Sequence, residues 1–131
     1  MDAAQALADL AEISSQIRAA VIFAAEGAVV GSTLADDDAA GRLAQGAEEL
    51  LAAAGDLGGA VTQVDASTPE GSVFVVRDGD RGIVATTAPS PTTGLVFYDL
   101  KSCLRAASDA KPKRRRRTTR RKTEDSADDA S

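Results

Sequence analysis

The pattern of apolar and polar residues predicts helices and strands in alternation over about the first hundred positions. From residue 2 to about residue 16, apolar side chains recur at spacings of three and four, which is typical of an amphipathic helix. The apolar run 19–25, the pair Glu26-Gly27 and the run 28–33 then predict a hairpin, because glycine readily adopts the backbone angles of a tight turn.

A second helix is predicted from the aspartates at 36–38 to about residue 54. Aspartates at a helix start accept hydrogen bonds from unpaired amides and face the positive end of the helix dipole. Gly46 lies in the middle of this helix, where glycine costs about 1 kcal/mol relative to alanine. Together with its apolar neighbours Leu43, Ala47 and Leu50, it indicates a surface that another backbone approaches closely. That backbone belongs either to the domain's own sheet or to a second subunit.

Three strand-like runs follow between residues 58 and 87, separated by turn residues at 68–71 and 78–80. Residues 73–76 are apolar at every position, so we expect this strand to be covered on both faces and to lie at the centre of the core. Asp78-Gly79 is typical of a tight hairpin turn. The pattern therefore predicts an antiparallel meander with helices on both sides of the sheet.

A third amphipathic helix is predicted after the proline-rich break at 88–91. Its inward-facing residues are expected to be Val96, Phe97, Leu100, Cys103, Leu104 and Ala107. We interpret Cys103 as a small buried hydrophobic residue rather than a reactive thiol. As the single cysteine, it excludes an intrachain disulfide and fits a reducing cytosol.

The composition changes at residue 108 to polar, low-complexity sequence. Residues 1–110 hold 6 basic and 16 acidic side chains, a net charge of −10, whereas residues 111–131 hold 9 basic and 4 acidic ones, a net charge of +5, so the whole chain carries −5. We expect a domain over residues 1–107 and a disordered, basic-then-acidic tail over residues 108–131. The tail's anion-binding residues would be Lys111, Lys113, Arg114, Arg115, Arg116, Arg117, Arg120, Arg121 and Lys122.

Motifs for catalysis, nucleotide binding and metal binding are missing from the sequence. It has no histidine, no paired cysteines and no Gly-x-Ser-x-Gly. The glycines at 55–59 precede a strand and lack the Lys-Ser or Lys-Thr of a phosphate-binding loop. The aspartates at 36–38 are interpreted as a helix start, because a hard cation needs converging ligands from elsewhere. We therefore expect no enzyme, no cofactor and no metal site.

No export signal or membrane-spanning segment is predicted. The first basic residue is Arg18, so no positively charged segment precedes an apolar run at the amino terminus. The longest apolar run, 19–25, is too short to span a bilayer. The expectation is a soluble cytoplasmic protein without membrane insertion.

The order of predicted elements (helix, hairpin, helix, three-stranded meander, helix) resembles the roadblock/dynein light-chain family over about residues 3–107. The resemblance rests on the strand–turn–strand at 19–31, the Ala-rich helix after Asp36, the strand at 71–76, and Pro91-Thr92-Thr93-Gly94-Leu95 at the start of the last helix. It implies an α/β (α+β) fold of order α-β-β-α-β-β-β-α. In that fold a five-stranded antiparallel sheet has helices on both faces, an architecture shared with profilin-like and longin domains.

The resemblance also implies a homodimer, formed through the second helix and the third strand so that the two sheets become continuous. By position, the dimer seam would contain Leu43, Gly46, Ala47, Leu50, Val61, Gln63 and Asp65. A regulatory role beside small Ras-like GTPases is implied as well. Some bacterial proteins that look like this stimulate GTP hydrolysis without carrying a nucleotide site.

Three functional hypotheses follow. The leading one is a non-catalytic dimeric adaptor or regulator of a small Ras-like GTPase. The main alternative is a dimeric module that presents its disordered basic tail to nucleic acid, since cationic tails bind phosphates without sequence preference. Against it, the tail lacks aromatic residues for base stacking and the body is acidic. A third hypothesis, contact with an anionic membrane, lacks a lipid-anchor motif and an apolar helix face.

Overall fold

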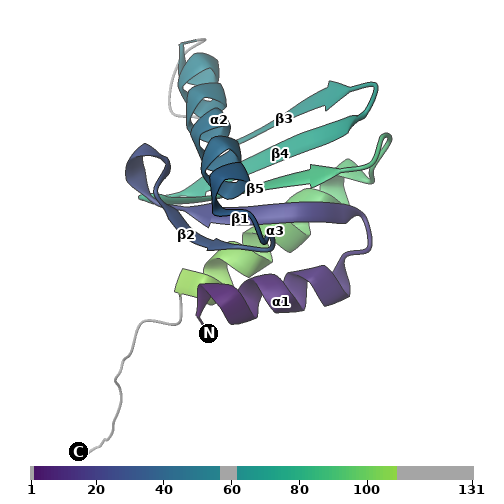
Figure 1. The fold of residues 1–131 in the computed structure, drawn as a ribbon. Coiled ribbons are helices and arrows are strands. Elements are labelled where there is room, and N and C mark those ends of the chain that lie inside the picture. The colour runs from purple at the N-terminus through teal and green to yellow at the C-terminus, as the bar shows by residue number, and fades with distance from the viewer. Residues whose placement is uncertain (1, 57–61, 109–131) are drawn as a thin grey trace, which may run out of the picture.

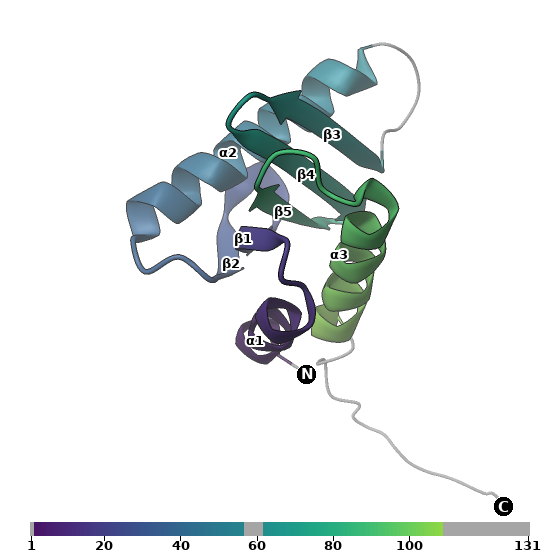
Figure 2. The same cartoon turned by 90° about the vertical axis from the view of Figure 1, so that its right-hand side faces the viewer.

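The computed structural model describes residues 2–56 and 62–108, which form one five-stranded sheet with helices on both faces (Figures 1 and 2). In chain order, the elements are α1 (Ala3–Ile13), β1 (Ile17–Phe23), the short 3-10 turn η1 (Ala25–Gly27), β2 (Val29–Ser32), α2 (Asp37–Gly55), β3 (Gln63–Thr68), β4 (Gly71–Asp78), β5 (Arg81–Thr87) and α3 (Thr93–Ser108). The predicted fold class and the order α-β-β-α-β-β-β-α are confirmed.

The sheet is antiparallel throughout, with the strand order β2-β1-β5-β4-β3. The hairpin β1–β2 and the meander β3–β4–β5 are joined by pairing of β1 with β5. The middle strand is therefore β5, and β4, which contains residues 73–76, lies next to it. The prediction that the strand at 73–76 is covered on both faces is confirmed, since β4 contributes buried residues to the cores on both faces. The apolar run shows that a strand is covered on both faces, but it does not show which strand pairs with β1. The open edges of the sheet are β2 and β3.

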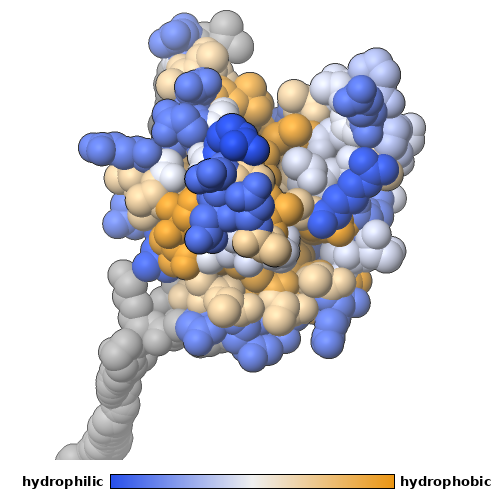
Figure 3. Space-filling view, viewed as in Figure 1, coloured by the Kyte–Doolittle hydropathy of each residue, from blue (hydrophilic) through white to orange (hydrophobic). Residues whose placement is uncertain are grey.

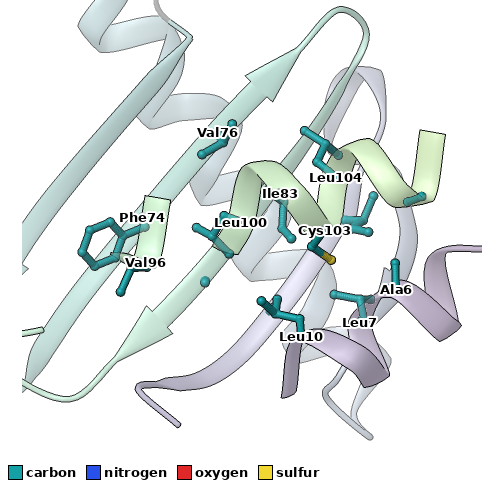
Figure 4. Close-up of a cluster of buried hydrophobic side chains, with 14 of the residues drawn as sticks. Ala6, Leu7, Leu10, Phe74, Val76, Ile83, Val96, Leu100, Cys103 and Leu104 are labelled. Atoms are coloured by element: carbon teal, nitrogen blue, oxygen red, sulfur yellow. The ribbon is translucent and has the colours of Figure 1, made fainter. Parts of the chain in front are cut away.

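Helices α1 and α3 cover one face of the sheet, and α2 covers the other (Figure 2). Successive strand residues point to opposite faces, so Ile22 belongs to the core under α1 and α3, while Val21 and Phe23 belong to the core under α2. In the first core, part of which is shown in Figure 4, the rings of Phe74 and Phe97 meet edge to face, with centroids 5.1 Å apart. The two separate cores explain why the apolar runs of β1, β4 and β5 do not alternate with polar residues.

The helix starts and the β4–β5 turn have the predicted local chemistry. An Asp2 carboxylate oxygen accepts a hydrogen bond from the Gln5 amide at 2.8 Å, and Asp36 accepts one from the Asp38 amide at 2.9 Å. Gly79 in the β4–β5 turn has a φ of +68°, which glycine adopts without strain.

Gly82 in β5 lies opposite Phe23 of β1, and a Cβ atom at this position would lie 2.5 Å from the Phe23 ring. Gly82→Ala should therefore lower the free energy of unfolding by about 1–3 kcal/mol, because the ring has to leave its place in the core. Denaturant unfolding measures this change. Gly41→Ala is the control, since a Cβ atom there meets nothing within 4 Å and should stabilise α2 by up to about 1 kcal/mol. Equal midpoints for Gly82→Ala and the unmodified chain would contradict the prediction.

Candidate functional site

The outer edge of β3 presents unpaired backbone groups. The Arg77 amide donates a hydrogen bond to the Thr62 carbonyl at 2.7 Å, so these two residues face each other in a hydrogen-bonded pair. Because such pairs alternate along an antiparallel ladder, Gln63, Asp65 and Ser67 direct their own N–H and C=O groups away from β4. The edge can therefore accept one more strand through these three residues.

The side chains of β3 divide between the two faces of the sheet. Gln63 and Asp65 lie opposite Val76 and Phe74, on the face covered by α1 and α3. Val64 lies on the other face, where it packs against the core under α2. Of the predicted seam residues in β3, Gln63 and Asp65 thus offer mainly their backbone groups, and both are exposed.

One flank of α2 is apolar and only partly covered. Leu43 and Leu50 pack against the core under α2 but remain half-buried. Gly46 lies on the same flank, three residues after Leu43 and four before Leu50, and it is exposed. A Cβ atom at Gly46 would meet nothing within 4 Å. The domain's own sheet is therefore not the backbone that approaches this glycine, and a second subunit remains as the predicted partner.

The apolar flank of α2 and the adjoining face of the β3–β4 hairpin form one surface, which we call the α2–β3 surface. Its members are Leu43, Gly46, Leu50, Val64 and Val73, of which the four larger residues are all partly exposed. In Figure 3, apolar side chains are visible between α2 and the β3–β4 hairpin. An apolar surface beside an open strand edge is suited to covering by another protein surface.

The remaining predicted seam residues do not reach this surface or lie outside the described residues. Ala47 is 2% exposed and packs beneath α2, so it holds the helix on the sheet. Val61 and the nine basic residues from Lys111 to Lys122 fall outside the described residues. Val73 was missed in the sequence because the run 73–76 was interpreted as fully buried, whereas Val73 is partly exposed.

An ion pair links α2 to the sheet on the side away from the apolar flank. The Arg77 guanidinium of β4 contacts the Glu48 carboxylate of α2 at 2.6 Å, and both side chains are largely buried. Glu48 lies two residues from Gly46 and from Leu50, so it is on a different side of the helix. The pair helps to fix the helix orientation that leaves Gly46 exposed and Leu43 and Leu50 only partly covered.

Within residues 2–56 and 62–108, no group of three or more His, Cys, Asp or Glu side chains is placed to hold a metal ion. The same part of the chain contains no helix that is both long enough and apolar enough to cross a bilayer.

Cys103 is buried between α3 and α1, as predicted (Figure 4). Burial, with a further contribution from the Asp9 carboxylate, raises the pKa of the Cys103 thiol from 9.0 to about 11. The folded chain should therefore resist thiol alkylation at pH 8 and react only when unfolded. The raised pKa favours the neutral thiol in the folded state, so its contribution to stability is complete below pH 9 and is lost as the pH rises towards 11. Rapid alkylation of the folded chain at pH 8 would contradict this.

The α+β fold, in which one helix covers one face of the sheet and two helices cover the other, is similar to that of several solved structures. The roadblock/LC7 domain from Streptomyces avermitilis superposes with a TM-score of 0.74 at 19% identity, covering 83% of this chain and 97% of that one. The gliding protein MglB from Thermus thermophilus gives a TM-score of 0.68 at 15% identity, covering 82% and 86%. A LokiProfilin1 in complex with rabbit actin gives 0.57 at 11% identity, covering 80% and 93%.

The chain therefore has the roadblock/LC7 fold, and the predicted resemblance is confirmed at the level of the fold. No family model matches the sequence, and no curated protein matches it. At these identities the common architecture shows the fold alone, so the function has to be argued from the surfaces.

Proposed function

We propose that this protein is a non-catalytic homodimeric regulator or adaptor of a small Ras-like GTPase. The observation that carries the proposal is the α2–β3 surface on a roadblock/LC7 fold. There, an open strand edge and a partly exposed apolar helix flank lie next to each other. These are the two elements through which the resemblance implies dimerisation.

A two-fold axis perpendicular to the sheet would pair β3 with β3 in antiparallel fashion and extend the sheet to ten strands. Both α2 helices then lie on one face of the continuous sheet, and both α1–α3 layers lie on the other. In this arrangement Leu43, Gly46 and Leu50 of each subunit become covered by the partner. The absence of a side chain at Gly46 lets the second backbone come close.

β3 is better suited to self-pairing than β2, the other open edge. β2 has four residues and its pairing with β1 is interrupted by a shift in register next to Phe23. Short or bulged edge strands resist edge-to-edge pairing, whereas β3 has six residues in regular register with β4.

Regulation of a GTPase is the function that this fold and surface support best. The chain carries no nucleotide-binding or catalytic motif, so it would act by binding the GTPase and biasing its state rather than by supplying a nucleotide site. The experiment that tests this is nucleotide-dependent binding of the dimer to cytoplasmic Ras-like GTPases from its own source. Failure with every such GTPase would overturn the proposal.

The second candidate function, presentation of the basic residues 111–122 to nucleic acid, rests on charge. This segment of 12 residues carries nine positive charges and no acidic residue. A dimer would bring two such segments to one polyanion and so increase the avidity.

A further inference from the structure

A second surface, on the face away from α2, is a groove between α1 and α3 with a volume of about 340 Å³. Asp9, Leu10 and Ile13 line it from α1, and Tyr98, Asp99 and Ala106 line it from α3. The floor is apolar, since Leu10 and Cys103 belong to the core under the two helices (Figure 4). Two side chains at the rim are unusually exposed for apolar or aromatic residues, Ile13 at 72% and Tyr98 at 68%.

Asp99 is the most unusual residue of the groove. It is only 8% exposed, and the described part of the chain provides no hydrogen-bond or ion-pair partner for its carboxylate. Because it lines the groove, it can be reached from that side. A carboxylate in the wall of an apolar groove, with no described cation or donor beside it, leaves room for a cationic group to form a charge-assisted hydrogen bond there.

Asp9 adds a second negative charge across the groove. Its carboxylate accepts one hydrogen bond, from the Gln5 side-chain amide on the same helix at 3.0 Å, and no described cation pairs with it. The negative charge of Asp9 acts within the groove, because it contributes to the raised pKa of the Cys103 thiol, which lines the same groove. The groove is therefore an apolar trough with acidic groups from both helices.

The combination of an apolar trough, two carboxylates and an exposed aromatic ring fits an arginine or lysine side chain. The methylene stem of such a side chain covers apolar surface while its charged head reaches a carboxylate. A guanidinium group can in addition stack on the face of Tyr98 and bind a carboxylate through two parallel hydrogen bonds.

We propose that the groove between α1 and α3 binds cationic side chains of the chain's own basic segment, residues 111–122. The segment begins at Lys111, three residues after Ser108, where α3 ends. Asp99 lies about 14 Å back along the helix from Ser108, at roughly 1.5 Å per residue. An extended chain covers about 3.3 Å per residue, so residues 113–117 can reach Asp99 and Asp9.

Charge and tethering favour this occupant over a separate partner. Residues 1–110 carry a net charge of −10, and the basic segment carries +9. A short tether also gives the segment an effective concentration in the millimolar range at the groove. The groove would thus compete with outside polyanions for the same cationic side chains and weaken the binding of the full chain to nucleic acid.

The test is tryptic cleavage of the basic segment in the full chain at low ionic strength, followed by mass spectrometry. The double variant Asp9→Asn/Asp99→Asn should be cleaved about fivefold faster within residues 111–122, the factor expected when ion pairs of about 1 kcal/mol are lost. The matched control, Glu70→Gln/Asp80→Asn, removes two exposed carboxylates from turns of the sheet and should be cleaved at the unmodified rate. In about 0.5 M NaCl all three proteins should be cleaved at one rate.

A carbodiimide cross-link on the unmodified full chain gives an independent readout. It should join Lys113 to Asp9 or Asp99 in preference to the other carboxylates. Ile13→Lys, at an exposed rim position that does not affect the core, should also speed tryptic cleavage, which keeps the test valid if the double variant unfolds. Equal cleavage rates in all variants, or cross-links spread evenly over the acidic residues, would overturn the proposal. A lower particle mass of the groove variants on light scattering, with an unchanged rate of tryptic cleavage, would also overturn the proposal. The groove would then bind a second copy of the chain rather than the basic segment.

Discussion

Replacing Gly46 by arginine should convert the proposed homodimer into monomers, and the same replacement at Gly41 should leave the dimer intact. Both glycines lie within α2, and a Cβ atom at either meets nothing within 4 Å in the subunit itself. They differ in direction, because five residues of α-helix turn the side-chain position by about 140°. Only Gly46 lies on the flank with Leu43 and Leu50.

The expected effect is large because the arginine at position 46 would be buried in the dimer without a partner. An uncompensated buried charge costs about 3–5 kcal/mol, which weakens the dimer at least about 100-fold. The subunit itself should not suffer, since arginine is a better helix former than glycine by up to about 1 kcal/mol. Light scattering at micromolar concentration should give the monomer mass for Gly46→Arg and the dimer mass for Gly41→Arg. A monomer mass for the unmodified protein would disprove the dimer itself.

Asp65→Pro tests the strand edge separately from the helix. The Asp65 amide points away from β4, so proline removes a donor that the subunit does not use. Pairing of β3 with a second β3 needs that donor, and the variant should therefore be monomeric. An unchanged dimer mass for Asp65→Pro would place the interface elsewhere on the domain.

The local features of the fold follow from the sequence because each depends on a few neighbouring residues. Asp2 and Asp36 cap helices through amides two or three positions away. The inward face of α3 follows from spacings of three and four. The strand order was not predictable in the same way. The run of four consecutive buried residues in β5 and the apolar run of β4 look alike in sequence. Only the pairing of β1 with β5 makes β5 the middle strand.

The candidate site was also predictable only in part, because helical spacing is read from neighbouring residues whereas the packing of α2 on the sheet is not. Helical spacing places Gly46 and Ala47 next to the same apolar stripe, yet Ala47 is buried and Gly46 is open. The difference is set by how α2 is turned on the sheet, which the Arg77–Glu48 ion pair helps to fix. Similarly, Gln63 and Asp65 would contribute to pairing with another strand through their backbone groups. These groups are unpaired only because β3 is an edge strand. The groove between α1 and α3 gave no sequence signal, since Asp9 and Asp99 are 90 residues apart.

Truncating the chain after Ala110 should distinguish the two candidate functions, GTPase regulation and nucleic-acid binding. Both cores lie within residues 2–108, so the shortened chain should fold and dimerise. If the domain regulates a GTPase through the dimer, nucleotide-dependent binding should stay within about twofold of the full chain, because the truncation leaves the α2–β3 surface unchanged. Gly46→Arg should lower that binding in both lengths of chain if the GTPase recognises the dimer, and Gly41→Arg serves as the control.

If the protein instead binds nucleic acid through the basic segment, the same truncation should abolish binding to duplex DNA. The affinity of the full chain should then fall steeply with salt, with a logarithmic slope of about −0.9 per neutralised phosphate. With six of the nine basic residues in contact with phosphates, the affinity should drop by about 10³ between 50 and 200 mM salt. Fluorescence anisotropy on labelled DNA measures this slope. Tight, salt-sensitive DNA binding by the full chain, together with no binding of the shortened chain to any Ras-like GTPase from its own source, would refute the GTPase proposal in favour of nucleic acid.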